Sequence, residues 1–240
     1  MARDGGEAGL TARLAAGVVT ARGDAVTDAA LTWARHCLTD WVAVTVAARG
    51  EPLVVALSGV AAAGPVPLLA GGRAALRDAV LTDGAAGHAL DYDDVNAEMR
   101  GHPTVPVAPV VMALGAAQGA SGRAVLEAFA AGYQVEAHLG AVTGDGHYEL
   151  GFHATGTLGT FGAAAAAAHL MGLGEAETAT ALGLAAAQAA GLKAMFGTDA
   201  KPLHAGKAAV NGLLAAELAA RGVTAHPGAL EAPQGFLATQ

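Results

Sequence analysis

The chain has 240 residues, of which 53% are hydrophobic and 14% are charged, and its formal net charge is −8. This composition excludes a disordered chain and is sufficient for one domain with a large buried core. The acidic balance, without a basic stripe that carries aromatic residues, excludes nucleic acid as an expected partner.

Small residues dominate the apolar fraction, which includes many alanines, while aromatic residues make up 4% of the chain. Alanine is the best helix former, and the alternating β-branched runs that form strands are scarce. No fixed-period repeat indicates a solenoid. The sequence therefore predicts an all-α fold, a compact domain of several closely packed helices.

Helical periodicity divides residues 9–221 into successive helices. Residues 1–8 lack periodicity, so we expect a frayed N-terminus before a first helix that begins near Leu10. Thr27 is a suitable N-cap for a second helix that ends near Gly50. Further helices are predicted at 53–63, 74–90, 105–118, 122–142, 157–173, 175–189 and 203–221, with a loop at 144–151. The tail, residues 222–240, is rich in Pro and Gly and is predicted to be loop.

Cys37 is the single cysteine and shares a predicted helix face with Trp33 and Trp41, at spacing i, i+4 and i+8. This spacing predicts a buried core thiol. One cysteine cannot form an intrachain disulfide, Met1 begins no signal segment, and charges or glycines interrupt every apolar stretch. We therefore expect a cytoplasmic protein that does not associate with a membrane.

Four short segments concentrate the polar chemistry, and the first is residues 87–94. On a helix His88 shares a face with Asp91 and with Tyr92, and a carboxylate beside an imidazole suits acid–base catalysis. A solvated helix end is the alternative, although the helix dipole disfavours carboxylates such as Asp91 and Asp94 at this position. The acidic cluster lacks the Gly and Glu spacing of an EF-hand loop, so a metal site is the lesser hypothesis.

The second and third segments each place a histidine near a helix start. Pro103 forces His102 out of helical geometry and into a loop. His153 and Thr155 precede a helix among small residues whose free N–H groups and hydroxyls suit an anion. A surface histidine and a capped helix start are the respective alternatives.

The fourth segment, residues 197–207, opens another helix and contains Thr198, Lys201, His204 and Lys207. Cations are mildly unfavourable near a helix N-terminus, so the lysines there favour a bound carboxylate. A solvated basic turn is the alternative.

In this order the four segments, with residues 231–236, resemble the MmgE/PrpD family, which includes dehydratases, decarboxylases and an epimerase. The resemblance implies an all-helical domain that binds a small polycarboxylate without a metal or organic cofactor. It also implies catalytic roles for Asp91, His102, His153 and Lys201. The remaining polar residues expected to bind substrate are His88, Asp94, Thr155, Thr198, His204 and Lys207.

The chain departs from the family pattern at several positions. Val95 stands where a Thr often follows the paired aspartates, residues 96–101 vary in length, and Gln134 and His138 replace an expected Glu and Arg. Family members are nearly twice as long and close their pocket with an α+β lid domain. We therefore expect residues 222–240 to lead to a lid that this sequence lacks, as in a fragment, a split enzyme or an inactive remnant.

The resemblance predicts a lyase that removes water or carbon dioxide from a small di- or tricarboxylic acid, such as a 2-methylcitrate-like substrate, and that forms a homodimer. An epimerase or isomerase that uses the same proton abstraction is the alternative within the family. A different class is a non-catalytic half that pairs with a separately encoded lid subunit. A helical bundle with coincidental motifs is the remaining alternative.

Overall fold

The computed structural model describes residues 8–240, within which the chain forms ten α-helices and one very short hairpin. The expectation for residues 1–7 lies outside the described residues. The helices are α1 (Leu10–Thr20), α2 (Asp28–Ala47), α3 (Pro52–Val60), α4 (Leu76–Ala89), α5 (Thr104–Gln118), α6 (Gly122–Glu149), α7 (Ala154–Met171), α8 (Glu175–Ala186), α9 (Ala200–Ala219) and α10 (Phe236–Thr239). Short 3₁₀ turns occupy Gly23–Ala25, Ala48–Gly50 and Lys193–Met195. The predicted all-α fold is confirmed.

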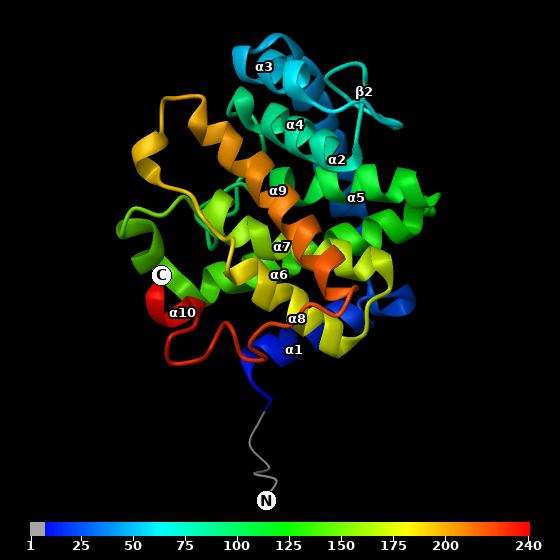
Figure 1. Ribbon diagram of the computed structural model, residues 1–240. Helices are drawn as coiled ribbons and strands as arrows, with labels where there is room; N and C mark the ends of the chain where they lie inside the picture. The colour runs from blue at the N-terminus through cyan, green and yellow to red at the C-terminus, as the bar shows by residue number, and fades with distance from the viewer. Residues whose placement is uncertain (1–7) are drawn as a thin grey trace, which may run out of the picture.

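Helix α7 forms the centre of the domain, and α5, α6, α8 and α9 pack around it (Figure 1). Every residue of α7 from Ala154 to His169 is buried. A Cβ atom on Gly212 of α9 would lie 2.5 Å from the Cβ atom of Ala163 in α7. The absence of a side chain at Gly212 therefore lets these two backbones approach closely, as the small-residue composition predicts.

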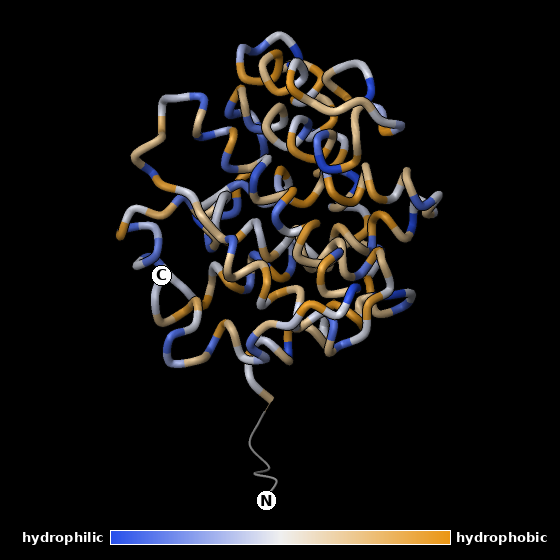
Figure 2. The backbone as a smooth tube through the Cα atoms, viewed as in Figure 1, coloured by the Kyte–Doolittle hydropathy of each residue, from blue (hydrophilic) through white to orange (hydrophobic). Residues whose placement is uncertain are grey.

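Along the chain, apolar stretches alternate with short hydrophilic ones (Figure 2). Within the described residues no single helix is long and apolar enough to cross a membrane, although one bent pair, Asp28–Gly50 with Pro52–Val60, passes on length and composition.

Three local predictions need correction. The first concerns a short hairpin, β1 (Val66–Pro67) with β2 (Arg73–Ala74), which was not predicted because two-residue strands are too short to show alternation. The second concerns the predicted loop at 144–151, most of which is helical. Gly144, with φ 58° and ψ −154°, redirects α6, but helical structure resumes and continues to Glu149.

The third correction concerns the helix face around Cys37. Trp41 is 1% exposed, but Cys37 is only half-buried and Trp33 is 68% exposed. Each four-residue step overshoots a full helical turn by about 40°, so Trp33 and Trp41 point about 80° apart. Residues at this spacing therefore run from the buried core at Trp41 to solvent at Trp33, and the Cys37 thiol lies between them.

The C-terminal tail, residues 222–240, packs against the start and the middle of the chain. Leu230 and Phe236 are buried, and the Glu231 carboxylate accepts hydrogen bonds from the backbone N–H and the hydroxyl of Thr11. Most of the tail is irregular, and it ends in the single helical turn of α10.

Candidate active site

The candidate active site lies where the loop of residues 90–103 meets the N-terminal ends of α7 and α9. A cavity of about 290 Å³ opens there. This volume suits a small organic acid, since drug-sized ligands need cavities at or above it. The cavity is lined by all four predicted catalytic residues and five others: Asp91, His102, His153, Lys201, Arg100, Gly101, Tyr148, Phe196 and Gly197.

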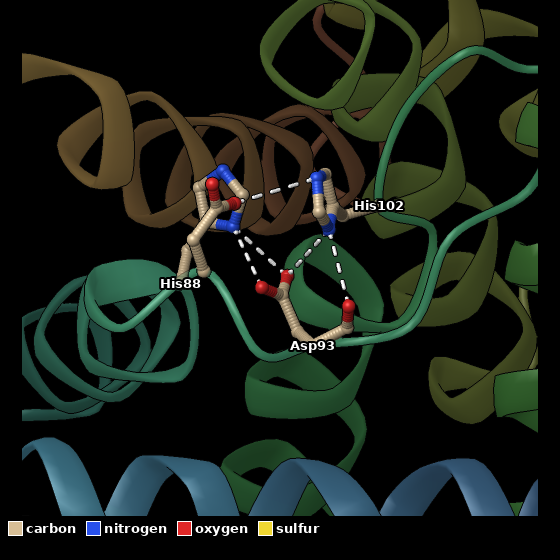
Figure 3. A group of neighbouring side chains, drawn as sticks. His88, Asp93 and His102 are labelled. Carbon is tan, nitrogen blue, oxygen red and sulfur yellow. Dashed lines mark hydrogen bonds and ion pairs between the residues drawn. The ribbon is translucent and has the colours of Figure 1, made fainter. Parts of the chain in front are cut away.

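Asp93 lies behind the residues that line the cavity and connects two histidines (Figure 3). Its carboxylate oxygens lie 2.9 and 3.0 Å from His88 Nδ1 and 3.3 Å from His102 Nδ1. A carboxylate can only accept, so both Nδ1 atoms carry hydrogen and donate. The side chains of His88 and Asp93 are 0% and 1% exposed. This buried cluster fixes the tautomer and the orientation of His102.

The electrostatics of the cluster favour an ionised Asp93 and a basic His102. Burial raises the pKa of Asp93, but hydrogen bonds and charge from His102 and His88 outweigh it and hold that pKa below its usual range. Burial lowers the pKa of His102, but its hydrogen bond to the Asp93 carboxylate outweighs burial, so the pKa is raised. The Asp93 carboxylate therefore favours the protonated form of His102.

Asp91 and Lys201 form a second, more accessible pair. The Lys201 ammonium donates to the Asp91 carboxylate, whose side chain is 60% exposed, and His102 Nε2 lies 3.6 Å from the same oxygen. Burial raises the pKa of Asp91, but the hydrogen bond and charge of Lys201 outweigh it and lower the pKa. Lys201 thus brings a positive charge to the cavity wall.

His153 is the neutral imidazole of the site. Its ring stacks with the ring of His88 at 5.6 Å, and the edge-on ring of Phe196 lies 5.0 Å away. Burial, followed by the positive charge of His88 and His204, lowers the pKa of His153 to about 2. Its Nδ1 lies 3.1 Å from His204 Nδ1, a contact in which one nitrogen must donate and the other accept. His153 is therefore uncharged before an anion binds.

Local backbone features explain how the chain positions these groups. Helix α4 ends at Ala89, and Asp91 adopts a left-handed conformation with φ 57° that few non-glycine residues occupy. Gly101 packs against the start of α7, where a Cβ atom would lie 3.0 Å from the Thr155 backbone nitrogen. The loop is therefore held against α7, and His102 and His153 face one cavity.

None of the six residues predicted to bind substrate lines the cavity, although the side chains of three contact residues that do. His88 contacts His102 and His153, and His204 contacts His153. The Thr155 hydroxyl accepts a hydrogen bond from the His102 backbone, at 3.0 Å. These three residues support the cavity wall, and direct substrate contact by them stays a prediction.

The side chains of the other three are directed at groups outside the cavity lining or at solvent. The Asp94 carboxylate accepts hydrogen bonds from the backbone N–H and the hydroxyl of Thr104, and so caps the start of α5. Thr198 is exposed, and its hydroxyl donates to the Met195 carbonyl. Lys207 is exposed, and its position six residues after Lys201 points it about 120° away on α9. Their assignment as substrate contacts also stays a prediction.

Sequence reasoning did not select Asp93, Arg100, Tyr148 or Phe196 as site residues. The helical spacing from His88 indicated Asp91, but α4 ends before that residue, and the following turn brings Asp93 to His88 instead. Tyr148 lies in the segment that was predicted to be loop. The run of three aspartates in residues 91–94 was the one available signal for Asp93.

Four side chains at the candidate site could also hold a metal ion. His88, Asp91, Asp93 and His102 each offer one ligand atom, and these atoms lie within 4.8 Å of one another. Imidazole and carboxylate are common ligands of divalent transition metals. The Lys201 ammonium already neutralises Asp91, so a metal ion would compete with a resident cation for that carboxylate.

Comparison with known proteins identifies relatives that match about two thirds of the chain. Human cis-aconitate decarboxylase is 34% identical over 163 residues, which cover 66% of this chain and 34% of that protein. The cis-aconitate decarboxylase of Mus musculus is also 34% identical over 163 residues, which cover 33% of it. That of Aspergillus terreus is 35% identical over 164 residues, with 65% and 34% coverage. The matched segment thus spans about a third of the length of these relatives.

The family model described as the MmgE/PrpD N-terminal domain matches residues 12–240. This range includes the whole site, from His88 to His204, and nearly all of the described helices. The chain therefore belongs to the MmgE/PrpD family.

Proposed function

We propose that this chain carries the catalytic groups of a cofactor-independent lyase that removes water or carbon dioxide from a small di- or tricarboxylic acid. The observation that carries the proposal is that one cavity joins a positive Lys201, a basic His102 and a neutral His153. Proton transfer beside a carboxylate needs an anion site, a proton donor and a proton acceptor together.

Lys201 and protonated His102 would bind the carboxylates of the substrate. The Asp91 carboxylate, being 60% exposed, is an exchangeable partner for Lys201 and holds the ammonium in position between turnovers. The Asp93 carboxylate contacts His102 at Nδ1, so the His102 Nε2 atom faces Asp91 at the cavity wall.

His153 would accept a proton from the carbon next to a substrate carboxylate. In a dehydration the electrons of that C–H bond form the C=C bond, and the β-hydroxyl leaves as water with a proton from His102. In a decarboxylation the C–CO₂ bond breaks instead, and the resulting carbanion takes its proton from His102. A bound anion beside His153 would also raise its pKa from about 2 towards the working range.

Proton NMR in deuterated water tests the proposal with citrate, 2-methylcitrate and cis-aconitate. We expect product signals with at least one acid, and their loss in Lys201→Ala. Arg49→Ala, which removes an exposed cation on another part of the surface, should keep the activity. Absence of both product and proton exchange with every acid would contradict the proposal for this chain.

Two related functions are outcomes of the same experiment. Exchange of a carbon-bound proton without elimination would indicate an epimerase, which returns the proton to the other face. Activity that requires a separately encoded lid subunit would indicate one half of a split enzyme. A homodimer and a cytoplasmic location, which the resemblance and composition favour, complete the proposal.

A further inference from the structure

The Lys201 ammonium and the His102 imidazole are already paired with carboxylates before any substrate binds. Lys201 pairs with Asp91, and His102 Nδ1 lies 3.3 Å from the Asp93 carboxylate. The whole chain carries a formal net charge of −8, so no long-range attraction assists an anion. An acid with two or three ionised carboxylates therefore needs a further cation at the cavity.

Arg100 is the remaining candidate. In the part of the chain that the structure describes, Lys201 and Arg100 are the two Lys or Arg residues that line the cavity. Lys193 is close by, but it is already engaged, since its ammonium donates to the Tyr148 carbonyl at 3.0 Å and lies 3.5 Å from the centre of the Tyr148 ring.

The ion pair that Arg100 makes is easily exchanged. One guanidinium nitrogen lies 2.6 Å from the Asp145 carboxylate, and the two side chains are 41% and 62% exposed. Exposed ion pairs of this kind contribute little to stability. A guanidinium has five N–H donors in a planar fork, so it can bind a second carboxylate in bidentate geometry.

The backbone holds Arg100 at the cavity at some cost. Its φ of 51° lies in the left-handed region, which is uncommon for residues other than glycine. The loop around it is closed by a β-bridge between Asn96 and Gly101 and is anchored by Met99, which is 2% exposed. Unfavourable backbone geometry that the surrounding structure enforces is concentrated at functional sites.

We propose that Arg100 binds one carboxylate of the substrate and so makes the site selective for acids that carry a third carboxylate group. This inference rests on the proposed function.

Isothermal titration calorimetry with two unreactive acids tests the proposal. Tricarballylate is glutarate with one additional carboxylate on its central carbon, so the pair differs only in the group under test. We expect the wild type to prefer tricarballylate. Arg100→Gln should weaken tricarballylate binding about tenfold, a typical value for a charged hydrogen bond, and glutarate binding less than about twofold. Arg49→Gln should change neither affinity.

Asp145→Asn separates a binding role from a structural one. If Arg100 binds substrate, removal of its competing carboxylate should tighten tricarballylate binding, whereas Arg100→Gln weakens it. The increase in tricarballylate affinity should be smaller when Asp145→Asn is combined with Arg100→Gln, because the double variant has no guanidinium that could be freed from Asp145. If the pair only stabilises the loop, both single variants should weaken binding together.

The outcomes distinguish the inference from the proposed function. The role of Arg100 would be overturned if the wild type binds both acids and Arg100→Gln changes the two affinities equally or leaves both unchanged. Either result would leave the lyase proposal standing. A wild type that binds neither acid would overturn both.

Discussion

A buried carboxyl group lies behind the candidate active site and another lies at the interface of α6 with α7, and their pKa values are shifted in opposite directions. Asp93 is 5% exposed and Glu136 is 0% exposed. Two imidazoles surround Asp93, and its pKa is lowered. Neither carboxyl oxygen of Glu136 has a hydrogen-bond partner within residues 8–240, and burial, followed by the charge of Asp94, raises its pKa well above the usual value.

The difference shows that depth alone does not decide the charge of a group in this domain. Glycines make room for Glu136, because a Cβ atom on Gly162 of α7 would lie 2.8 Å from its Oε2 atom. No charged group of opposite sign faces it there among the described residues. Behind the active site, His88 and His102 supply hydrogen bonds to Asp93 that reverse the effect of burial on its pKa. Charge is thus retained only where partners hold it.

Removing the Asp93 carboxylate should produce the largest effect. Asp93→Ala leaves His88 and His102 without an acceptor, and we expect the free energy of unfolding to fall by about 3 kcal/mol, as when one partner of a buried pair is lost. Urea denaturation at neutral pH measures the change.

The matched control is Asp91→Ala, which removes a carboxylate that is 60% exposed from the same loop. Its effect on stability should be about 1 kcal/mol or less. Similar losses in the two variants would show that burial of the Asp93 cluster does not stabilise the fold.

Neutralising Glu136 should have a smaller effect of opposite sign. Because its folded pKa is raised, its favourable contribution is present below the unfolded value of about 4.5 and is lost as the pH rises. The free energy of unfolding of Glu136→Gln should therefore exceed that of the wild type by about 2 kcal/mol at alkaline pH. At acidic pH the two values should differ little. Chemical denaturation at both pH values checks this.

Exposed Glu98 provides the control, because Glu98→Gln changes the same group where water solvates it. Its stability should match that of the wild type at both pH values. A Glu136→Gln variant that is destabilised equally at both would show that the carboxylate finds a partner in solution.

The same contrast explains which parts of the molecule were predictable. Helix spacing depends on local periodicity, so the helices of residues 9–221 and the order of the polar segments follow from the sequence. The break at Gly144 and the left-handed turn at Asp91 depend on tertiary packing, which periodicity does not encode. The partner of His88 was therefore predicted as Asp91, two residues before the one that binds it.

Arg100 shows the same limit from another side. Its segment, residues 96–101, has no periodicity, and a single arginine in a loop is ordinarily a surface residue. Its position at the cavity follows from the bridge between Asn96 and Gly101 and from burial of Met99, neither of which leaves a local sequence signal. Loop residues that complete a site are thus the part that a single sequence predicts least well.

Acid titration should reveal the smallest effect and separate the two carboxyl groups most directly. The folded pKa of Asp93 is lowered, so its contribution to stability is present above the unfolded value of about 3.8 and is lost as the pH falls. The stability gap between the wild type and Asp93→Asn should shrink by about 1 kcal/mol between pH 5 and pH 3. The folded pKa of Glu136 is raised, so the stability of the wild type relative to Glu136→Gln should change in the opposite direction, rising by about 0.8 kcal/mol as the pH falls from 5 to 3. Fluorescence of Trp41, which is buried in the native fold, reports unfolding at each pH. Parallel curves for the two variants would mean that the histidines do not hold the Asp93 charge.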